Sequence, residues 1–155
     1  MTRQLLIDKL SRAIAEKEGF YVTAEQAKQR QIKYPTRALR NANPGNIRQW
    51  RDAQGRQYPT DGGYVDFVQW AADKLHTGDY EAISREALAE GWRVLRVLVS
   101  QYMDGRYTGG RPPTIMEMFS VYAPSGDGND SAAYARFIAQ RLGADIHDRL
   151  IDLIR

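Results

Sequence analysis

The chain has 155 residues, with 22 Lys and Arg against 19 Asp and Glu and no cysteine. This length predicts one domain over residues 1–155, which buries about two thirds of its unfolded surface around a single core. The lack of cysteine excludes a disulfide framework and a thiol nucleophile, and His76 and His147 are too far apart in sequence for a local metal motif, so neither a metal nor a cofactor is expected.

The N-terminal 19 residues are amphipathic and charged, and they lack the continuous apolar run of a secretory signal. No later stretch approaches the length of a membrane span. We therefore expect a chain without a signal peptide that is made in the cytoplasm, and any action outside the cytoplasm requires delivery by another system.

Positive charge is concentrated in residues 28–56. This segment carries eight basic residues against the single acid Asp52, a net charge of +7, and the rest of the chain carries −4. The eight are Lys28, Arg30, Lys33, Arg37, Arg40, Arg48, Arg51 and Arg56. Such a segment favours an anionic polymer as partner, either nucleic acid or bacterial cell wall, and the alternative is an arginine-rich loop region that is merely solvated.

Apolar spacing and capping residues predict the first elements. Ile7, Leu10 and Ile14 recur at steps of three and four and predict a helix from Arg3 to Glu18. A second, short helix begins at Thr23, which forms a capping-box pattern with Gln26, and it ends before Tyr34 and Pro35.

The middle of the chain changes character and then returns to helix. Glycine-rich and Asn-Pro-Gly turns between residues 37 and 64 predict a small irregular β-hairpin region. The predicted helices after it are 65–76, 80–88, 90–103, 114–122, 131–142 and 145–154. The expected fold class is α+β, predominantly helical, with one small sheet inserted after the first helices.

Glu18 is the strongest catalytic candidate. It is the next residue on the apolar stripe of the first helix, and Gly19 follows as a helix-ending residue. Burial and the negative end of a helix both raise the pKa of a carboxyl, as a general acid near neutral pH requires. The alternative is a glutamate that extends into water from the last turn.

Four segments, in chain order, carry a resemblance to a known family: residues 13–20 (AIAEKEGF), 40–48 (RNANPGNIR), 63–67 (GYVDF) and 122–134, which begins Tyr-Ala-Pro. Together they resemble a phage-type group of the lysozyme-like superfamily, whose members are virion-associated or lysis muramidases and lytic transglycosylases. Residues 68–90 are longer than in that pattern. The resemblance implies a lysozyme-like fold, Glu18 as catalytic acid, and peptidoglycan glycan strands as substrate. It also implies action in the periplasm or cell wall after delivery by a virion or a lysis system, with other virion proteins as further partners.

The number of carboxylates bears on the reaction. Protonation of the glycosidic oxygen between N-acetylmuramic acid and N-acetylglucosamine suits Glu18, and a hydrolase normally adds a second carboxylate. Asp61 is the candidate for it, although Asp52, Asp61 and Asp66 all lie in patterns typical of turns or helix starts. A lytic transglycosylase needs only one acid and base, so we favour that reaction over a hydrolytic muramidase.

Six polar and aromatic residues are candidates for substrate binding: Asn43, Asn46, Trp50, Tyr58, Tyr122 and Asn129. Amide groups and aromatic rings suit acetamido groups and sugar faces. The alternatives are turn chemistry for Asn43 and Asn46, core packing for Tyr122 and helix capping for Asn129. Trp70 and Trp92 lie on helical stripes and are expected in the core.

Two other functions compete with catalysis. One is a non-enzymatic virion or DNA-associated protein that uses residues 28–56 on phosphates. Against it, the segment contains neither a recognisable recognition helix nor an aromatic stacking platform. The other is a peptidoglycan-binding module that retains the fold without activity.

Overall fold

The computed structural model describes residues 1–155, which divide into two compact units. Unit 1 is made of both ends of the chain, Met1–Lys17 and Arg96–Arg155, and unit 2 is the continuous segment Glu18–Leu95. The chain passes between the units twice, once directly before Glu18 and once inside a long helix. Length alone predicted one domain and gave no sign of this division; the expected single catalytic domain stays a prediction.

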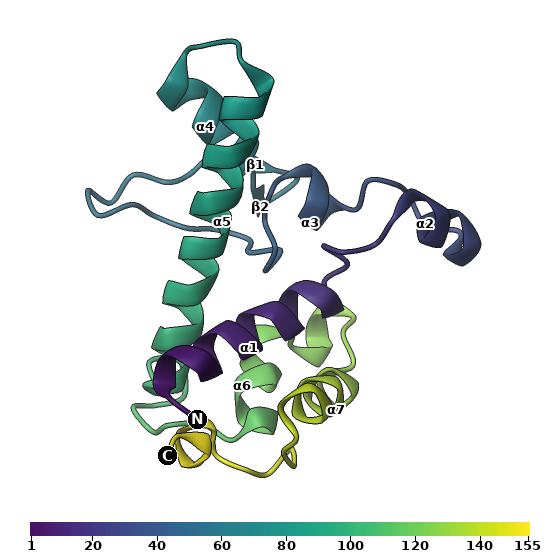
Figure 1. The fold of residues 1–155 in the computed structure, drawn as a ribbon. Helices are drawn as coiled ribbons and strands as arrows, with labels where there is room; N and C mark the ends of the chain where they lie inside the picture. The colour runs from purple at the N-terminus through teal and green to yellow at the C-terminus, as the bar shows by residue number, and fades with distance from the viewer. The chain divides into compact units, whose positions relative to one another are not determined.

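Unit 1 is helical. Its elements are α1 (Arg3–Lys17), the last part of α5 (Tyr80–Met103), α6 (Ile115–Tyr122), the 3-10 turn η1 (Ser125–Asp127), α7 (Ser131–Leu142) and the 3-10 turn η2 (Leu150–Leu153). Helices α1, α6 and α7 lie together, and the two chain ends are neighbours (Figure 1). The backbone N–H of Arg155 donates to the carbonyl of Met1 at 2.9 Å, which closes the unit.

The core of unit 1 is formed by the apolar stripes that the sequence pattern predicts. Its fully buried members are Leu6, Leu10, Ile14, Val99, Ile115, Met118, Phe119, Ala135, Ile138 and Leu150. The ends of α6 and α7 are also as predicted. Thr114 and Glu117 form a capping box, and Gly143 ends α7 with a φ of +67°.

Unit 2 holds the small sheet. Its elements are α2 (Ala24–Arg30), α3 (Arg37–Arg40), β1 (Thr60–Asp61), β2 (Tyr64–Val65), α4 (Phe67–Leu75) and the first part of α5. The strands are antiparallel, with Thr60 opposite Val65 and Asp61 opposite Tyr64. Gly62 and Gly63 form the connecting turn, where both have a positive φ that favours glycine. The predicted hairpin is thus present, reduced to two residues a strand.

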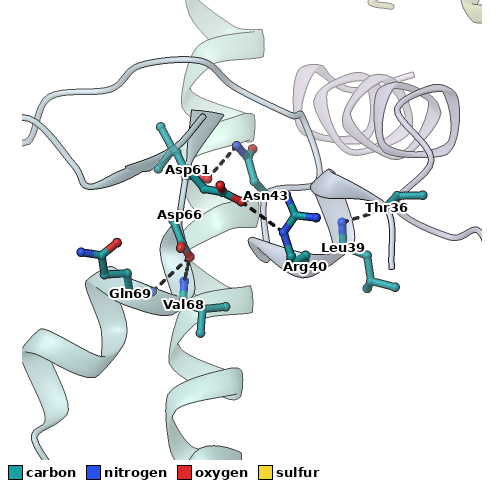
Figure 2. Close-up of polar contacts among 9 residues, drawn as sticks. Thr36, Leu39, Arg40, Asn43, Asp61, Asp66, Val68 and Gln69 are labelled. Atoms are coloured by element: carbon teal, nitrogen blue, oxygen red, sulfur yellow. Dashed lines mark hydrogen bonds and ion pairs between the residues drawn. The ribbon is translucent and has the colours of Figure 1, made fainter. Parts of the chain in front are cut away.

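The start of α2 is as predicted, and the start of α4 differs from the prediction. Thr23 and Gln26 form the expected capping box of α2. Asp66 caps α4 by accepting hydrogen bonds from the N–H groups of Val68 and Gln69, both at 3.1 Å (Figure 2). Because Asp66 is the cap, α4 begins at Phe67, two residues later than predicted.

The prediction of separate helices over 80–88 and 90–103 was wrong, because α5 runs unbroken from Tyr80 to Met103. Gly91 lies inside this helix and does not end it. A glycine is required here by the close approach of a neighbouring loop. A Cβ at this position would lie 2.1 Å from the carbonyl oxygen of Ala42 and 3.1 Å from Cδ of Pro44. Gly91 therefore lets the Asn-Pro-Gly loop approach the helix backbone.

The predicted helix over 145–154 was also wrong, since only η2 forms there. The backbone of this segment instead pairs with the start of α6. Ile115 and Met116 donate to the carbonyls of Asp148 and Ile146, and Leu150 donates to Pro113. These bonds use backbone groups of the segment outside a helix, and residues 146–148 form a turn before η2.

The chain is accordingly α+β and mostly helical, as the sequence predicts. None of its helices combines the length and the apolar character needed to cross a bilayer.

Candidate functional site

Glu18 follows the last residue of α1 directly and lies in a turn with Gly19, whose φ is +82°. The helix ends one residue earlier than predicted. The stripe residues Leu10 and Ile14 are fully buried, whereas Glu18 is half-buried. The carboxylate therefore belongs to a turn at the helix end, neither enclosed in the core nor extended fully into water.

Hydrogen bonds fix this turn to α3. The hydroxyl of Thr36 donates to the carbonyl oxygen of Gly19 at 2.9 Å and accepts from the N–H of Leu39 at 3.3 Å, as the N-cap of α3 (Figure 2). A Cβ at Gly19 would lie 3.4 Å from Cγ2 of Thr36. The positive φ favours glycine next to Glu18, and the hydrogen bond from Thr36 ties this turn to a neighbouring element.

Asp61 is held by Arg40 from the same short helix. Nε and Nη2 of Arg40 donate to Oδ2 of Asp61 at 3.1 and 2.8 Å (Figure 2). These bonds hold the pKa of Asp61 below its ordinary value, because they stabilise the ionised carboxylate. Helix α3 thus links the Glu18–Gly19 turn to Asp61. Its N-cap Thr36 bonds to Gly19, and its last residue Arg40 bonds to Asp61.

The other two acids considered for the reaction have structural roles. Asp66 is the N-cap of α4. Asp52 accepts from the backbone N–H groups of Gln54 and Arg56 and from Nε of Arg56, and the backbone bond from Arg56 is the main cause of its lowered pKa. Both observations agree with the turn and cap interpretation of their sequence context.

The structure gives the substrate-binding candidate Asn43 a role in holding the fold, and ligand binding by this residue stays a prediction. Its side chain is fully buried, and both N–H groups of its amide donate, to the carbonyls of Ile47 at 2.9 Å and Val65 at 3.1 Å. Its Oδ1 accepts from the N–H of Ile47 at 2.9 Å. The amide holds the loop against β2 and has no N–H group left for a ligand.

Asn46 differs from Asn43 although the two flank the same Pro-Gly turn. Its backbone is left-handed, with a φ of +47°, and its N–H donates to the carbonyl of Asn43. Its Oδ1 is buried and accepts no hydrogen bond. An acceptor without a donor is costly in a protein interior, so Asn46 keeps its place as a candidate for binding a ligand N–H or O–H.

Tyr58 lies in the core of unit 2, and its contact with substrate stays a prediction that this burial disfavours. Its ring is 5% exposed and stacks on Trp70 with centroids 5.6 Å apart. Its hydroxyl donates to Oε2 of Glu90 at 2.8 Å, and burial together with this carboxylate raises the pKa of Tyr58 to about 12. Neither ring face nor hydroxyl is available to a sugar.

The sequence interpretation missed Glu90. Its side chain is only 10% exposed, and its carboxylate accepts from Tyr58 and from Nε of Arg93. The spacing of Glu90 and Arg93 by three residues in a helix was the signal available for the ion pair, but nothing local indicated Tyr58. Trp50 remains a half-buried candidate, whose carbonyl accepts from the N–H of Tyr58 at 2.9 Å.

The two candidates in unit 1 lie around the end of α6. Tyr122 is half-buried in a cluster of rings, with centroids 5.7 Å from Tyr102, 5.7 Å from Phe119 and 6.1 Å from Tyr134. Asn129 is exposed and donates from Nδ2 to the carbonyl of Pro124 at 3.3 Å. These contacts agree with the packing and loop-closing alternatives, and they leave binding by either residue as a prediction.

The chain contains no group of three or more His, Cys, Asp or Glu side chains arranged to hold a metal ion.

Comparison of the chain with protein-family models, with curated proteins and with solved structures gives no match.

Proposed function

We propose that this chain cleaves the β-1,4 bond between N-acetylmuramic acid and N-acetylglucosamine in bacterial peptidoglycan, with Glu18 as the acid and then the base. The main support is the position of Glu18 at the end of α1. Glu18 is half-buried on a turn that Gly19 and Thr36 hold in place. The lysozyme-like order of segments around it favours the same assignment.

Glu16 shows why the choice falls on Glu18. Glu16 is exposed and paired with Arg141, whose Nη2 and Nε donate to its carboxylate at 2.7 and 3.0 Å. This pairing lowers the pKa of Glu16, whereas a general acid near neutral pH requires a raised pKa. A half-buried glutamate at a helix end is the better general acid.

Transglycosylation is the favoured reaction. Glu18 gives its proton to the glycosidic oxygen as the bond to the muramic C1 breaks. The resulting carboxylate takes the proton of the muramic C6 hydroxyl as that oxygen bonds to C1. The product ends in 1,6-anhydromuramic acid, and the enzyme is returned with Glu18 protonated. The route needs one carboxylate, which suits a chain where Asp52, Asp61 and Asp66 are held by other groups.

Hydrolysis by a muramidase is the second candidate, and the state of Asp61 is the observation that favours it. Arg40 lowers the pKa of Asp61 further below neutral pH, and the ionised carboxylate is the form that a nucleophile or a general base requires. The hydrolytic route would use Asp61 to attack C1 or to activate water.

Under either reaction the chain would act in the periplasm or cell wall after delivery by a virion or a lysis system. Glycan strands would be its substrate, and other virion proteins would be further partners.

The experiment is digestion of purified peptidoglycan sacculi by the wild type, Glu18→Gln and Glu16→Gln. We expect Glu18→Gln to fold normally and to lose at least ~10²-fold in rate, the usual contribution of general acid catalysis. Glu16→Gln is the matched control, since it removes a carboxylate two residues away, and it should retain activity. Wild-type turnover by Glu18→Gln would end the proposed role of Glu18.

A further inference from the structure

The segment from Thr23 to Tyr34 lies almost entirely on the surface of unit 2. It contains α2 and the turn that follows it, and Ala27 is its only buried residue. A helix of seven residues is too short to be stable by itself in water, and the burial of one alanine adds little to it. The segment therefore contributes almost nothing to the core, and its side chains face solvent.

Hydrogen bonds at both ends give this exposed segment a regular backbone. The capping box of Thr23 holds the start of α2. At the other end Gln31 is left-handed, with a φ of +57°, and the N–H of Ile32 donates to the carbonyl of Ala27 at 3.0 Å. This bond brings the turn back against the helix, so residues 28–34 form one surface, which we call the α2 surface.

The α2 surface carries an excess of positive charge. Lys28, Arg30 and Lys33 are exposed and belong to none of the ion pairs of the chain. Glu25 is the only acid between residues 23 and 34, so the segment has a net charge of +2. Lys28 and Arg30 lie in the last turn of α2, where positive charge stabilises a helix end, but Lys33 lies beyond the helix. The surface is therefore complementary to an anionic partner.

Two large apolar side chains lie among these charges. Ile32 and Tyr34 are 46% and 47% exposed, and they stand on either side of Lys33 in the chain. The contact with the helix that usually accompanies a left-handed cap accounts for the position of Ile32, yet it leaves nearly half of the residue in water.

Cations next to an aliphatic and an aromatic side chain suit the boundary between water and lipid. Lys and Arg reach lipid phosphates, a tyrosine ring fits the head-group region, and an aliphatic side chain enters the acyl boundary. A phosphate polymer in water would be attracted by the same charges but would give the exposed isoleucine no apolar environment. The combination therefore favours a lipid surface over a nucleic acid.

We propose that the α2 surface binds an anionic lipid bilayer from the aqueous side. Its three cations lie at the lipid phosphates, and Ile32 and Tyr34 enter the boundary between head groups and acyl chains. The binding is peripheral and reversible, because so few groups fall short of a stable membrane anchor. This inference goes beyond the proposed function and does not depend on it.

The test is co-sedimentation of the full chain with lipid vesicles at low salt. One set of vesicles is phosphatidylcholine alone, and the other is an equal mixture of phosphatidylcholine and phosphatidylglycerol. We expect binding to the mixed vesicles only, and a loss of binding on addition of salt, which screens the attraction. Replacement of Lys28, Arg30 and Lys33 together by Gln should lower the partition coefficient on the order of 10²-fold, since each basic residue near an anionic membrane contributes about fivefold.

Matched single variants separate the α2 surface from the general properties of the chain. Ile32→Ser should weaken binding about fivefold, because it removes apolar area that leaves water on insertion. Ile151→Ser is its control, since Ile151 is 44% exposed but lies in unit 1, and it should bind as the wild type does. Arg30→Gln should likewise cost about fivefold, whereas Arg85→Gln, at an exposed position on α5, should leave binding unchanged.

Four outcomes would overturn the inference. They are no binding of the wild type to mixed vesicles, equal binding to both kinds of vesicle, wild-type binding by Ile32→Ser, and tighter binding of a short DNA duplex through the same three cations. Circular dichroism of each variant checks that the fold is kept. The vesicles contain no peptidoglycan, so the result is independent of the activity on sacculi.

Discussion

Two asparagines, Asn43 and Asn129, show how differently the same residue type is used in this fold. Asn43 and Asn129 are both turn residues in sequence, and either could have served a ligand or the fold. The structure buries Asn43 completely and uses its amide three times, while Asn129 is exposed and makes one longer bond. The sequence alone cannot show which asparagine is buried and which is exposed. The partners of the Asn43 amide include Val65, which is distant in sequence and reaches Asn43 only in the folded chain.

Asn43→Ala should lower the free energy of unfolding by ~2–4 kcal/mol, because it leaves buried backbone groups of Ile47 and Val65 without partners. Denaturant unfolding measures this change. Asn129→Ala, the control on an exposed loop, should remain within about 0.5 kcal/mol of the wild type. A stable Asn43→Ala protein with weakened glycan binding would restore Asn43 as a ligand residue.

We expect the free energy of unfolding to fall at alkaline pH because of two buried tyrosines, Tyr58 and Tyr102. Burial raises the pKa of both Tyr58 and Tyr102 from 10.0 to about 12, and Glu90 adds to the shift of Tyr58. The folded state then holds protons that the unfolded state releases first. The stabilising contribution is complete below pH 10 and falls as the pH rises toward 12.

Unfolding measured at several pH values, with absorbance titration of the tyrosines, tests this prediction. The slope of stability against pH should be smaller in Tyr58→Phe than in the wild type, since one of the two groups is gone. An identical slope in both proteins would show that Tyr58 titrates normally.

At the scale of elements, the sequence predicts what local signals control. The capping boxes at Thr23 and Thr114 and the glycine after α7 mark helix ends correctly, because each acts within one turn of backbone. The break predicted near Gly91 was wrong, because a glycine is needed there to make room for the carbonyl of Ala42 and does not mark a helix end. The helix predicted over residues 145–154 was wrong as well, because their backbone pairs with residues 113–116.

Gly91→Ala should lower the free energy of unfolding by ~1–3 kcal/mol. In a helix with open space at that position, the same substitution would stabilise the helix. The added Cβ would lie 2.1 Å from the Ala42 carbonyl oxygen, so the loop or the helix must move. Gly126→Ala is the control, because that position is open and has no positive φ. Thermal unfolding of both variants decides the point; equal midpoints would refute the close approach of loop and helix.

For the whole molecule, the sequence predicted the fold class and the place of Glu18 at a helix end. It did not predict that the chain forms two compact units, nor that the chain enters unit 2 at Glu18. It predicted a basic segment of charge +7 but not which of its arginines are neutralised. Folding pairs Arg40 with Asp61 and Arg56 with Asp52.

The candidate site was predicted only in part for the same reason. Glu18 and Asp61 were proposed from helix and turn patterns, which are local, and they stay predictions. The burial of Tyr58 could not be predicted, because its partners Trp70 and Glu90 are distant in sequence. The hydrogen bonds from Arg40 that lower the pKa of Asp61 could be recognised only once the hairpin was placed beside α3.

The central claim is that Glu18 alone carries the acid and base steps of glycan cleavage. Mass analysis of the muropeptides that the wild type, Glu18→Gln and Asp61→Asn release from purified sacculi tests it most directly. The account predicts products that end in 1,6-anhydromuramic acid and are lighter by one water than reducing muropeptides. They should disappear in Glu18→Gln and persist in Asp61→Asn. Reducing muropeptides that are lost in Asp61→Asn, or no release by the wild type, would contradict it.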